Sequence, residues 1–276
     1  MKVAIFFAVY ERLGVLKIFL DGLDRLKKDH PDIEWIPFGV YTNDDEGEIL
    51  KKRKIHSLQY SNEFLGRKKN AGLKALMELD WDYMMEMGSD DLVRSELIDI
   101  YKPLWEQGVN VFGTNSCYFI ETCTGKVAKW KHNYAIGAGR CIKRSVFVGF
   151  GQSIKVRYLD SYGGEVSFSK GQVEIYPYVL ANKLIDSGMC ELVKDMREPF
   201  GLWTDTRNIA LDGDSEFRLG VNGFGVKVLD LEPMVVDIKS GHNIHSFDRF
   251  TVCDKTLDDV LVCFSKKEAD GIRKLR

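Results

Sequence analysis

The sequence predicts an α/β protein with a largely parallel central sheet. Three nearly continuous apolar runs, at 2–9, 33–41 and 81–87, are typical of strands that are covered on both faces. Segments with the periodicity of amphipathic helices separate these runs. The order β-α-β-α-β favours parallel strands joined by right-handed crossovers, because two parallel neighbours need a long connection.

The elements of the first hundred residues follow from these patterns. KVAIFFAV is the first strand, and a stripe of leucines then marks a helix over 13–28. IEWIPFGVY is the second strand, and it ends at the polar stretch TNDDEG (42–47). GRKKNAGLKALMEL (66–79) is rich in helix formers and leads to the third strand, WDYMMEM. That strand ends abruptly at Gly-Ser-Asp-Asp (88–91).

The remaining residues predict a different arrangement. VNVFGT, CYFIET and KVAKW are short strands around a Thr-Gly turn, which predicts a hairpin added to the sheet. Residues 150–172 show little periodicity, so we expect a loop or lid there. Pro177 and Gly188 frame a helix around YVLANKLID. Two strands within 226–239 and a C-terminal helix with a basic end complete the chain.

Composition excludes several classes of protein. Lys and Arg (39) nearly balance Asp and Glu (41) at a formal charge of −2, so any contact with nucleic acid must be local. Six cysteines include no CxxC pair and no cluster with zinc spacing, which indicates reduced thiols in a cytoplasmic protein. The first apolar run is too short for a membrane span and lacks the features of a signal peptide.

Polar residues follow each of the three predicted strands. Tyr10 and Glu11 follow the first strand, residues 43–45 follow the second, and residues 89–91 follow the third. Ligands of open α/β sheets bind at the carboxyl ends of the strands. The topology therefore predicts that these three clusters converge on one edge of the sheet.

The adjacent carboxylates of Asp90 and Asp91 have two interpretations. Carboxylates at a strand end suit a hard cation such as Mg²⁺ or Mn²⁺, which shares its oxygen ligands with substrate phosphates. Alternatively, Ser89 or Asp90 is the N-cap of a helix that starts near Leu92, because Ser and Asp are preferred caps. The pattern alone leaves both open.

Three further groups of residues are candidates for chemistry. The segment 67–70 (Arg-Lys-Lys-Asn) lies within reach of an anionic ligand at the sheet edge, although a solvated basic surface has the same pattern. Asp212 and Asp214 are candidates for a general base. His242 and His245 follow an apolar strand, where a histidine could complete a metal site or simply lie in a polar loop.

In combination, these residues resemble the family 2 glycosyltransferases of the GT-A fold. The resemblance depends on the order of five features along one chain. They are an apolar strand ending in Tyr-Glu, an acidic turn, Gly-Arg-x-x-Asn-x-Gly, a strand ending in an Asp pair, and a late Asp-x-x-x-x-x-Arg. The resemblance is clearest over 1–100, weaker over 134–148 and partial over 211–245.

The resemblance implies a single GT-A domain over 1–276. Residues 1–100 would form the nucleotide-sugar-binding half, 101–250 the acceptor and catalytic half, and 251–276 a C-terminal helix. The fold is α/β with a Rossmann-like nucleotide-binding half, a mixed central sheet with helices on both faces, and a small antiparallel hairpin.

The resemblance also implies roles for individual residues. The base and ribose of the donor would be held by Val9, Tyr10, Glu11 and either Asp44 or Asp45. Arg67 and Asn70 would line the donor pocket, and Ser89 and Asp90 would contact the donor. The family's acceptor-side segment is matched by Gly137, Ala138, Gly139 and Arg140. Its catalytic Asp, about six residues before an Arg, falls on Asp212 with Arg218, and Asp214 is the alternative.

The family's Asp-x-Asp metal element corresponds to Gly-Ser-Asp-Asp, with one departure. Gly88 occupies the position where the family commonly has its first Asp. Asp90 is therefore the first candidate metal ligand and Asp91 the second, with His242 or His245 as a further ligand.

The resemblance predicts a metal-dependent inverting glycosyltransferase that uses Mn²⁺ or Mg²⁺. The donor would be a nucleotide-diphosphate sugar, with a UDP-sugar expected. The acceptor hydroxyl would belong to a glycan, a protein or a hydroxymethylated DNA base. The location would be the cytoplasm of a bacterium or of a virus-infected host cell.

Other functions fit the sequence less well. A non-catalytic, transferase-like module that binds nucleic acid or protein is the main alternative, supported by Gly88 and the basic cluster KKRK (51–54). A nucleotidyltransferase would need a Gly-x-Gly-Thr-Arg loop after the first strand, which AVYERLG lacks. A Rossmann dehydrogenase would need GxGxxG there, and GVNGFG occurs only at 220–225.

Overall fold

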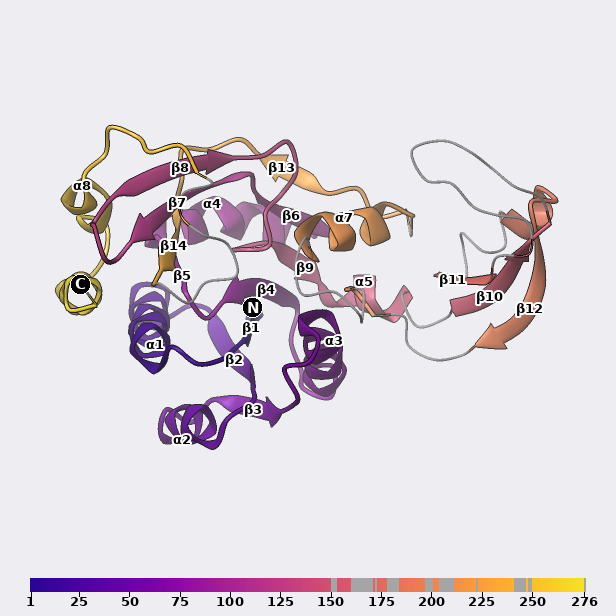
Figure 1. Cartoon of the computed structure of the whole chain (residues 1–276), viewed down its shortest axis with the longest axis horizontal. Helices are drawn as coiled ribbons and strands as arrows, with labels where there is room; N and C mark the ends of the chain where they lie inside the picture. The colour runs from indigo at the N-terminus through magenta and orange to yellow at the C-terminus, as the bar shows by residue number, and fades with distance from the viewer. Residues whose placement is uncertain are drawn as a thin grey trace.

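The protein, described here from a computed structural model, consists of an α/β body and a small separate sheet (Figure 1). The structure describes residues 1–149, 153–159, 171, 173–177, 184–196, 201–203, 211–221, 223–240, 247 and 250–275. The first part of the chain alternates strands and helices. Its elements are β1 (Lys2–Ala8), α1 (Leu13–Asp29), β2 (Glu34–Tyr41), α2 (Asp44–Lys52), β3 (His56–Gln59), α3 (Leu65–Leu76) and β4 (Tyr83–Gly88).

The later part of the chain is richer in short strands. Up to residue 149 its elements are β5 (Asp91–Val93), α4 (Ser95–Glu106), β6 (Val111–Thr114), β7 (Ser116–Glu121), β8 (Val127–Lys131), β9 (Cys141–Lys143) and α5 (Arg144–Gly149). Beyond that come β10 (Ser153–Tyr158), β11 (Val173–Pro177), β12 (Cys190–Met196), α7 (Leu211–Val221), β13 (Lys227–Leu229), β14 (Val235–Lys239), α8 (Leu257–Leu261) and α9 (Lys266–Arg273).

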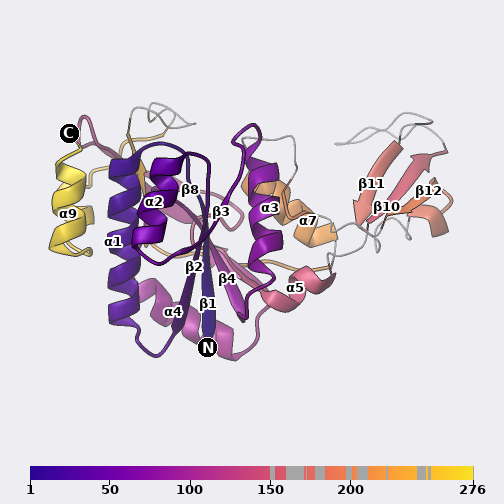
Figure 2. The ribbon, with the colours of Figure 1, turned by 90° about the horizontal axis from the view of Figure 1, so that it is seen from below.

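The central sheet is mixed and has the strand order β13-β6-β9-β4-β1-β2-β3. β1 pairs in parallel with both β2 and β4, whereas β9 runs antiparallel to β4 and β6. Helices cover both faces, with α1 and α2 on one side and α3, α5 and α7 on the other (Figure 2). This arrangement confirms the predicted α/β fold class, with a mixed central sheet and helices on both faces.

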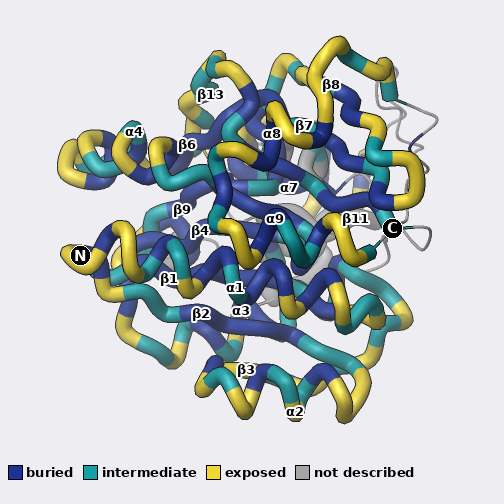
Figure 3. The backbone as a smooth tube through the Cα atoms, turned by 90° about the vertical axis from the view of Figure 1, so that its left-hand side faces the viewer, coloured by how far each residue is buried: buried dark blue, intermediate teal, exposed yellow. Residues whose placement is uncertain are grey.

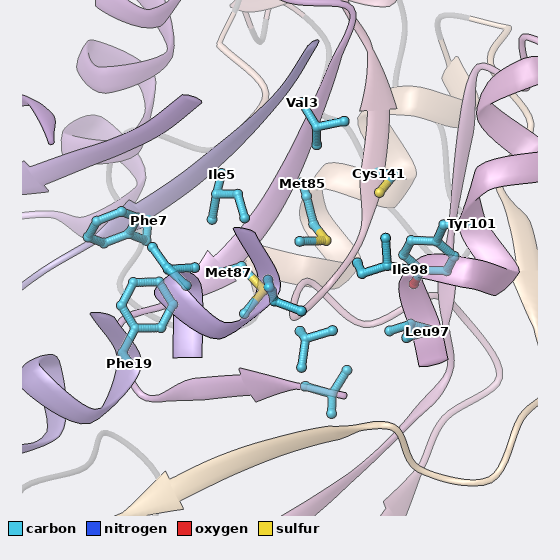
Figure 4. Packing of buried hydrophobic residues seen from close by; sticks show 14 of the residues in the cluster. Val3, Ile5, Phe7, Phe19, Met85, Met87, Leu97, Ile98, Tyr101 and Cys141 are labelled. Atoms are coloured by element: carbon cyan, nitrogen blue, oxygen red, sulfur yellow. The ribbon is translucent and has the colours of Figure 1, made fainter. Parts of the chain in front are cut away.

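Strand β1 is apolar along its whole length because helices cover both faces of the sheet. Val3, Ile5 and Phe7 point to the face that carries α1 and α4, where they pack with Met85 and Met87 of β4 (Figure 4). The alternate residues of β1 pack against α3 on the opposite face. Figure 3 shows the central strands running through the buried interior.

A second sheet, with the order β5-β14-β7-β8, lies beside the central one. One of its faces joins the core that α1 and α4 share with β1. The other packs against α8, α9 and the N-terminal half of α1. A third, antiparallel sheet, β11-β10-β12, projects away from the body (Figure 1).

Several predicted elements need correction. Helix α2 and strand β3 were not predicted. The polar stretch after β2 is not a turn but the start of helix α2, whose capping box joins Asn43 and Glu46. The predicted hairpin exists as β7 and β8, but it belongs to the second sheet.

Further corrections concern the chain after residue 149. The expected loop over 150–172 contains β10, and Pro177 ends a strand instead of starting a helix. Residues 178–183, in the expected helix, lie outside the described residues. The C-terminal region forms two helices, α8 and α9. In the described part of the chain, no helix is both long and apolar enough to cross a membrane.

Candidate cation and donor site

The carboxyl ends of three parallel strands meet at one edge of the central sheet. Ala8 at the end of β1 is in register with Val40 of β2 on one side and with Gly88 of β4 on the other. The backbone N–H of Val9 extends this contact by donating to the Val40 carbonyl, 2.8 Å away. The polar residues that follow β1, β2 and β4 are therefore brought together, as the topology predicted.

Three carboxylates gather next to this edge. Asp90, Asp91 and Asp237 each have an oxygen within 4.8 Å of the others, and we call them the acidic cluster. Asp90 and Asp91 continue from β4 into β5, and Asp237 lies on β14. Because β5 and β14 pair antiparallel, Asp91 and Asp237 are direct cross-strand partners. The Asp90 carbonyl also accepts a hydrogen bond from the Ile238 N–H at 2.9 Å.

In the described part of the chain, two cations contact the acidic cluster, one fewer than its carboxylates. Arg12 Nη1 lies 2.9 Å from Asp90 Oδ2, and Lys239 Nζ lies 2.7 Å from Asp237 Oδ2. Arg12 is aimed by a left-handed turn after β1, in which Glu11 and Arg12 both have positive φ values of 57° and 53°. With all groups ionised, the cluster and its two cations retain one net negative charge.

The protonation behaviour of the cluster reflects this excess of negative charge. Burial, together with the charges of Asp90 and Asp237, raises the pKa of Asp91 well above its ordinary value. Burial and the charge of Asp90 raise the pKa of Asp237 to about 6, even though Lys239 opposes the shift. The described cations near these two carboxylates therefore do not offset the effects of burial and of the neighbouring negative charges on their pKa values.

The cluster fits a divalent cation by its donor atoms. Asp237 Oδ1 is buried and has no hydrogen-bond partner among the described residues. A buried carboxylate oxygen without a partner is costly, and a hard cation such as Mg²⁺ or Mn²⁺ takes carboxylate oxygens as ligands. Asp90, Asp91 and Asp237 are the residues that would hold it.

Gly88 has a steric reason for lacking a side chain. A Cβ atom at this position would lie 2.5 Å from Asp90 Oδ1 and 2.9 Å from Asp91 Oδ2. The backbone N–H of Gly88 instead donates a hydrogen bond to Asp91 Oδ2. The chain turns back so closely after β4 that a carboxylate at position 88 would collide with the two that follow.

The alternative of a helix cap is wrong. Residues 91–93 form strand β5, and the helix expected near Leu92 begins only at Ser95. Its N-cap residue is Arg94, which makes no side-chain capping bond. The Asp pair is therefore not needed to start a helix. Ser89 is buried beside the cluster.

The loop after β2 is held by a buried carboxylate that sequence reasoning missed. Glu46 is fully buried and accepts hydrogen bonds from the backbone N–H groups of Thr42 (2.9 Å) and Asn43 (3.1 Å). It also accepts one from the N–H of Glu11, which ties the loops after β1 and β2 together. The predicted donor residues Tyr10, Glu11, Asp44 and Asp45 are exposed around this link, whereas Val9 is buried.

The basic segment at the start of α3 is not the solvated surface that its composition also allowed. Lys68 is fully buried, and its Nζ donates to Val9 O, Thr42 Oγ1 (2.8 Å) and Asn62 Oδ1 (3.2 Å). Burial lowers the pKa of Lys68 to about 8. Lys68 thus joins the loops that follow β1, β2 and β3.

The two predicted donor residues of this segment differ from each other. Arg67 is 42% exposed and forms an ion pair with Glu63 at 3.5 Å. Asn70 instead holds a distant segment, because its amide donates to Trp203 O (2.6 Å) and accepts from Trp203 N (3.1 Å). Arg67 is therefore accessible to a ligand, whereas Asn70 positions the segment around Trp203.

The predicted acceptor segment ends in a buried arginine. Gly137, Ala138 and Gly139 lead to Arg140, which is fully buried. Arg140 Nη2 donates to Glu86 Oε2 at 2.7 Å and to Ser215 Oγ at 2.5 Å. This arginine connects the middle of β4 to helix α7.

The remaining predicted residues are only partly described. Asp212 and Asp214 lie in the first turns of α7, but their side chains are outside the described residues. Arg218, on the same helix, donates to the Gly201 carbonyl at 3.2 Å. His242 and His245 also lie outside the described residues, so their roles and those of Asp212 and Asp214 stay predictions.

Sequence reasoning missed Asp237, Lys239 and Arg12. The signal for the first two was present in VVDIK, because strand alternation places Asp237 and Lys239 on the same face of an otherwise apolar strand. Arg12 had no comparable signal, since its position depends on the left-handed turn after β1.

Comparisons with known proteins extend only to the fold. No protein-family model matches the sequence, and no curated protein matches it either. Two solved structures of TarS from S. aureus are similar, with TM-scores of 0.47 and 0.45 and identities of 11% and 15%. They align with 86% and 87% of this chain, which spans 60% and 37% of theirs.

The solved structure of 4-diphosphocytidyl-2C-methyl-D-erythritol synthase from Anaerococcus prevotii is also similar. Its TM-score is 0.41 at 15% identity, over 84% of this chain and 89% of that one. At these identities the likenesses concern the fold alone.

Proposed function

We propose that this protein is a metal-dependent inverting glycosyltransferase. It would transfer a sugar from a nucleotide-diphosphate donor, with a UDP-sugar expected, to an acceptor hydroxyl. The single observation that carries this proposal is the acidic cluster, which joins the carboxyl end of β4 to the middle of β14 and, among the described residues, has an excess of negative charge and an unpartnered Asp237 Oδ1. Such a site at the edge of an open α/β sheet suits a cation that binds a diphosphate.

The donor would lie across the loops that follow β1, β2 and β4. The exposed Tyr10 ring and the Glu46-linked loop, which carries Asp44 and Asp45, would border the base and ribose. Arg67 is partly exposed in the first turn of α3 and would contact an anionic part of the donor. In this proposal residues 1–100 bind the donor and residues 101–250 hold the acceptor.

The chemistry requires a base, a leaving group and a neutralising charge. Asp212 or Asp214 would remove the proton from the acceptor hydroxyl, whose oxygen attacks the anomeric carbon. The bond from that carbon to the diphosphate breaks on the opposite side, and the configuration inverts. Mn²⁺ or Mg²⁺, when bound by Asp90, Asp91 and Asp237, would supply positive charge to the diphosphate.

A thermal-shift titration with UDP, with and without Mn²⁺, tests this proposal, together with release of UDP from UDP-sugars. We expect UDP to raise the melting temperature only when Mn²⁺ is present, and we expect slow donor hydrolysis. Asp212→Asn or Asp214→Asn should lower the rate of transfer by roughly 10² to 10⁴-fold while UDP binding persists.

The non-catalytic alternative predicts a different result. A transferase-like binding module would release no UDP from any donor at any Mn²⁺ concentration. A protein that neither binds UDP with Mn²⁺ nor hydrolyses a donor would contradict the proposed function.

A further inference from the structure

A row of aromatic side chains lies beside the acidic cluster and has no role in the donor site. The ring centroids of Phe119 and Phe250 lie 3.9 Å apart, and Trp130 lies 5.9 Å from Phe119. The row continues from Trp130 to His132 (5.2 Å) and from His132 to Tyr134 (3.6 Å). We call these five residues the aromatic row. Phe119 is buried, whereas the other four are partly exposed.

Strand pairing places the start of this row on the same sheet face as the acidic cluster. Asp237 is the cross-strand partner of Asp91 on one side and of Phe119 on the other. Phe119 and Trp130 lie two pairs apart on the β7–β8 ladder and share this face, because Phe119 pairs with Ala128 and Trp130 with Cys117. One face of the second sheet therefore carries both carboxylates and aromatic rings.

Lys239 joins the two features directly. Its Nζ lies 2.7 Å from Asp237 Oδ2 and 4.7 Å from the centroid of the Phe119 ring. An ammonium over an aromatic face is attracted by the ring, so Lys239 is held between the cluster and the row. Phe119 and Lys239 are themselves buried, so the partly exposed rings of the row lie one residue removed from the acidic cluster.

The other end of the row reaches the helix that carries the candidate bases. A Cβ atom added to Gly213 would lie 3.9 Å from the Tyr134 hydroxyl. Gly213 stands between Asp212 and Asp214 near the start of α7. The aromatic row therefore extends from the proposed cation site to the helix that would deliver the base.

We propose that the aromatic row binds a sugar ring of the acceptor, so that the acceptor is a carbohydrate. This inference rests on the proposed function. The C–H bonds on one face of a pyranose form an apolar surface that packs on an aromatic ring, while its hydroxyls remain free for hydrogen bonds. Partly exposed rings such as Trp130, His132 and Tyr134 suit this contact, because they combine an apolar face with a polar edge.

The charges on the described strand β8 favour a neutral acceptor over DNA. Strand alternation places Lys129 and Lys131 on the face of β8 opposite to Trp130. Both are also in ion pairs, Lys129 with Glu232 at 2.7 Å and Lys131 with Asp230 at 2.6 Å. Binding to DNA draws its affinity from Lys and Arg contacts with phosphates, and β8 offers the aromatic face no such side chain.

The test compares saccharides with DNA as ligands of the protein in the presence of UDP and Mn²⁺. Saturation-transfer difference NMR with a panel of neutral methyl glycosides and disaccharides should show contact at the ring C–H protons of at least one saccharide. Trp130→Ala and Tyr134→Ala should each weaken that binding roughly ten-fold, whereas Trp130→Phe should restore most of it. Donor hydrolysis should stay within about two-fold of wild type in all three variants, because the donor site is intact.

Tyr118→Ala is the matched control, since Tyr118 lies on the same hairpin but on the opposite face. It should leave saccharide binding unchanged. The inference is overturned if no saccharide binds, if Trp130→Ala binds it as wild type does, or if a duplex with 5-hydroxymethylcytosine binds in its place. Failure of the wild-type protein to bind UDP with Mn²⁺ would instead overturn the proposed function and, with it, this inference.

Discussion

Strand β4 and the residues that directly follow it contribute to two buried clusters of charge, and the carboxyl pKa values of these clusters shift in opposite directions. In the first, Glu86 accepts from Lys69 and Arg140, and Arg140 also donates to Ser215. Burial raises the pKa of Glu86, but the two cations outweigh burial and hold that pKa below its usual value. In the acidic cluster, by contrast, the pKa values of Asp91 and Asp237 are raised.

The difference lies in the balance of charge. Glu86 has two cations for one carboxylate, so its burial is compensated within the protein. Among the described residues, the acidic cluster has three carboxylates for two cations, and Asp237 Oδ1 has no hydrogen-bond partner. A buried charge that is fully paired indicates a structural role, whereas an uncompensated one at a sheet edge indicates a ligand site.

Removing a partner from the paired cluster should have the largest effect. Arg140→Ala leaves Glu86 buried with less positive charge and removes the link to Ser215 on α7. We expect the free energy of unfolding to fall by about 3–5 kcal/mol, measured by urea denaturation. Arg157→Ala is the control, because Arg157 forms an exposed ion pair with Glu191 and should cost about 0–1 kcal/mol. Equal losses in the two variants would refute the structural role of the paired cluster.

Crowding the acidic cluster should have a smaller effect. Gly88→Ala adds a methyl group whose carbon would lie less than 3 Å from both Asp90 Oδ1 and Asp91 Oδ2. The carboxylates must move, so we expect a loss of about 1–3 kcal/mol in the free energy of unfolding and a lower affinity for Mn²⁺. Gly220→Ala is the matched control, because no atom of the described residues outside the local backbone of α7 lies within 4 Å of its added Cβ. A Gly88→Ala protein with wild-type stability and Mn²⁺ affinity would show that the turn has room for a side chain.

Lys68 offers a third case, a buried cation whose hydrogen-bond acceptors are all neutral. Its pKa is lowered to about 8 in the folded protein, whereas in the unfolded chain the pKa is near 10.5. Between these values the unfolded chain holds the proton and the folded protein does not, so this group makes stability rise with pH. In urea denaturation from pH 8 to 10.5, wild type should gain stability relative to Lys68→Met. The exposed Lys51→Met should follow wild type, and a parallel pH profile for Lys68→Met would contradict the lowered pKa.

The fold was largely predictable because periodicity is local. A single short segment is enough to recognise each of the apolar strands β1, β2 and β4, and the same holds for the leucine stripe of α1. Helix α2 was missed because its sequence, DDEGEILKK, is mostly polar and is held by the cap at Glu46 more than by an apolar stripe. The short edge strand β3 carries too few apolar residues to be recognised.

The site residues were predictable only where they are neighbours in the sequence. Asp90 and Asp91 could be predicted because they directly follow a buried strand. Asp237 comes from a strand about 150 positions later, and only the pairing of β5 with β14 brings it to Asp91. The aromatic row likewise depends on the ladder between β7 and β8 and on contacts that span many residues, which no local pattern reveals.

Direct measurement of Mn²⁺ binding tests the central claim most sharply. Isothermal titration of the wild-type protein should reveal one Mn²⁺ site, and Asp237→Asn should weaken it by at least roughly ten-fold. Asp230→Asn, which removes an exposed carboxylate paired with Lys131, should bind Mn²⁺ as wild type does. A wild-type protein that binds no Mn²⁺ at millimolar concentration, or an Asp237→Asn protein with unchanged affinity, would contradict the assignment of the acidic cluster as a cation site.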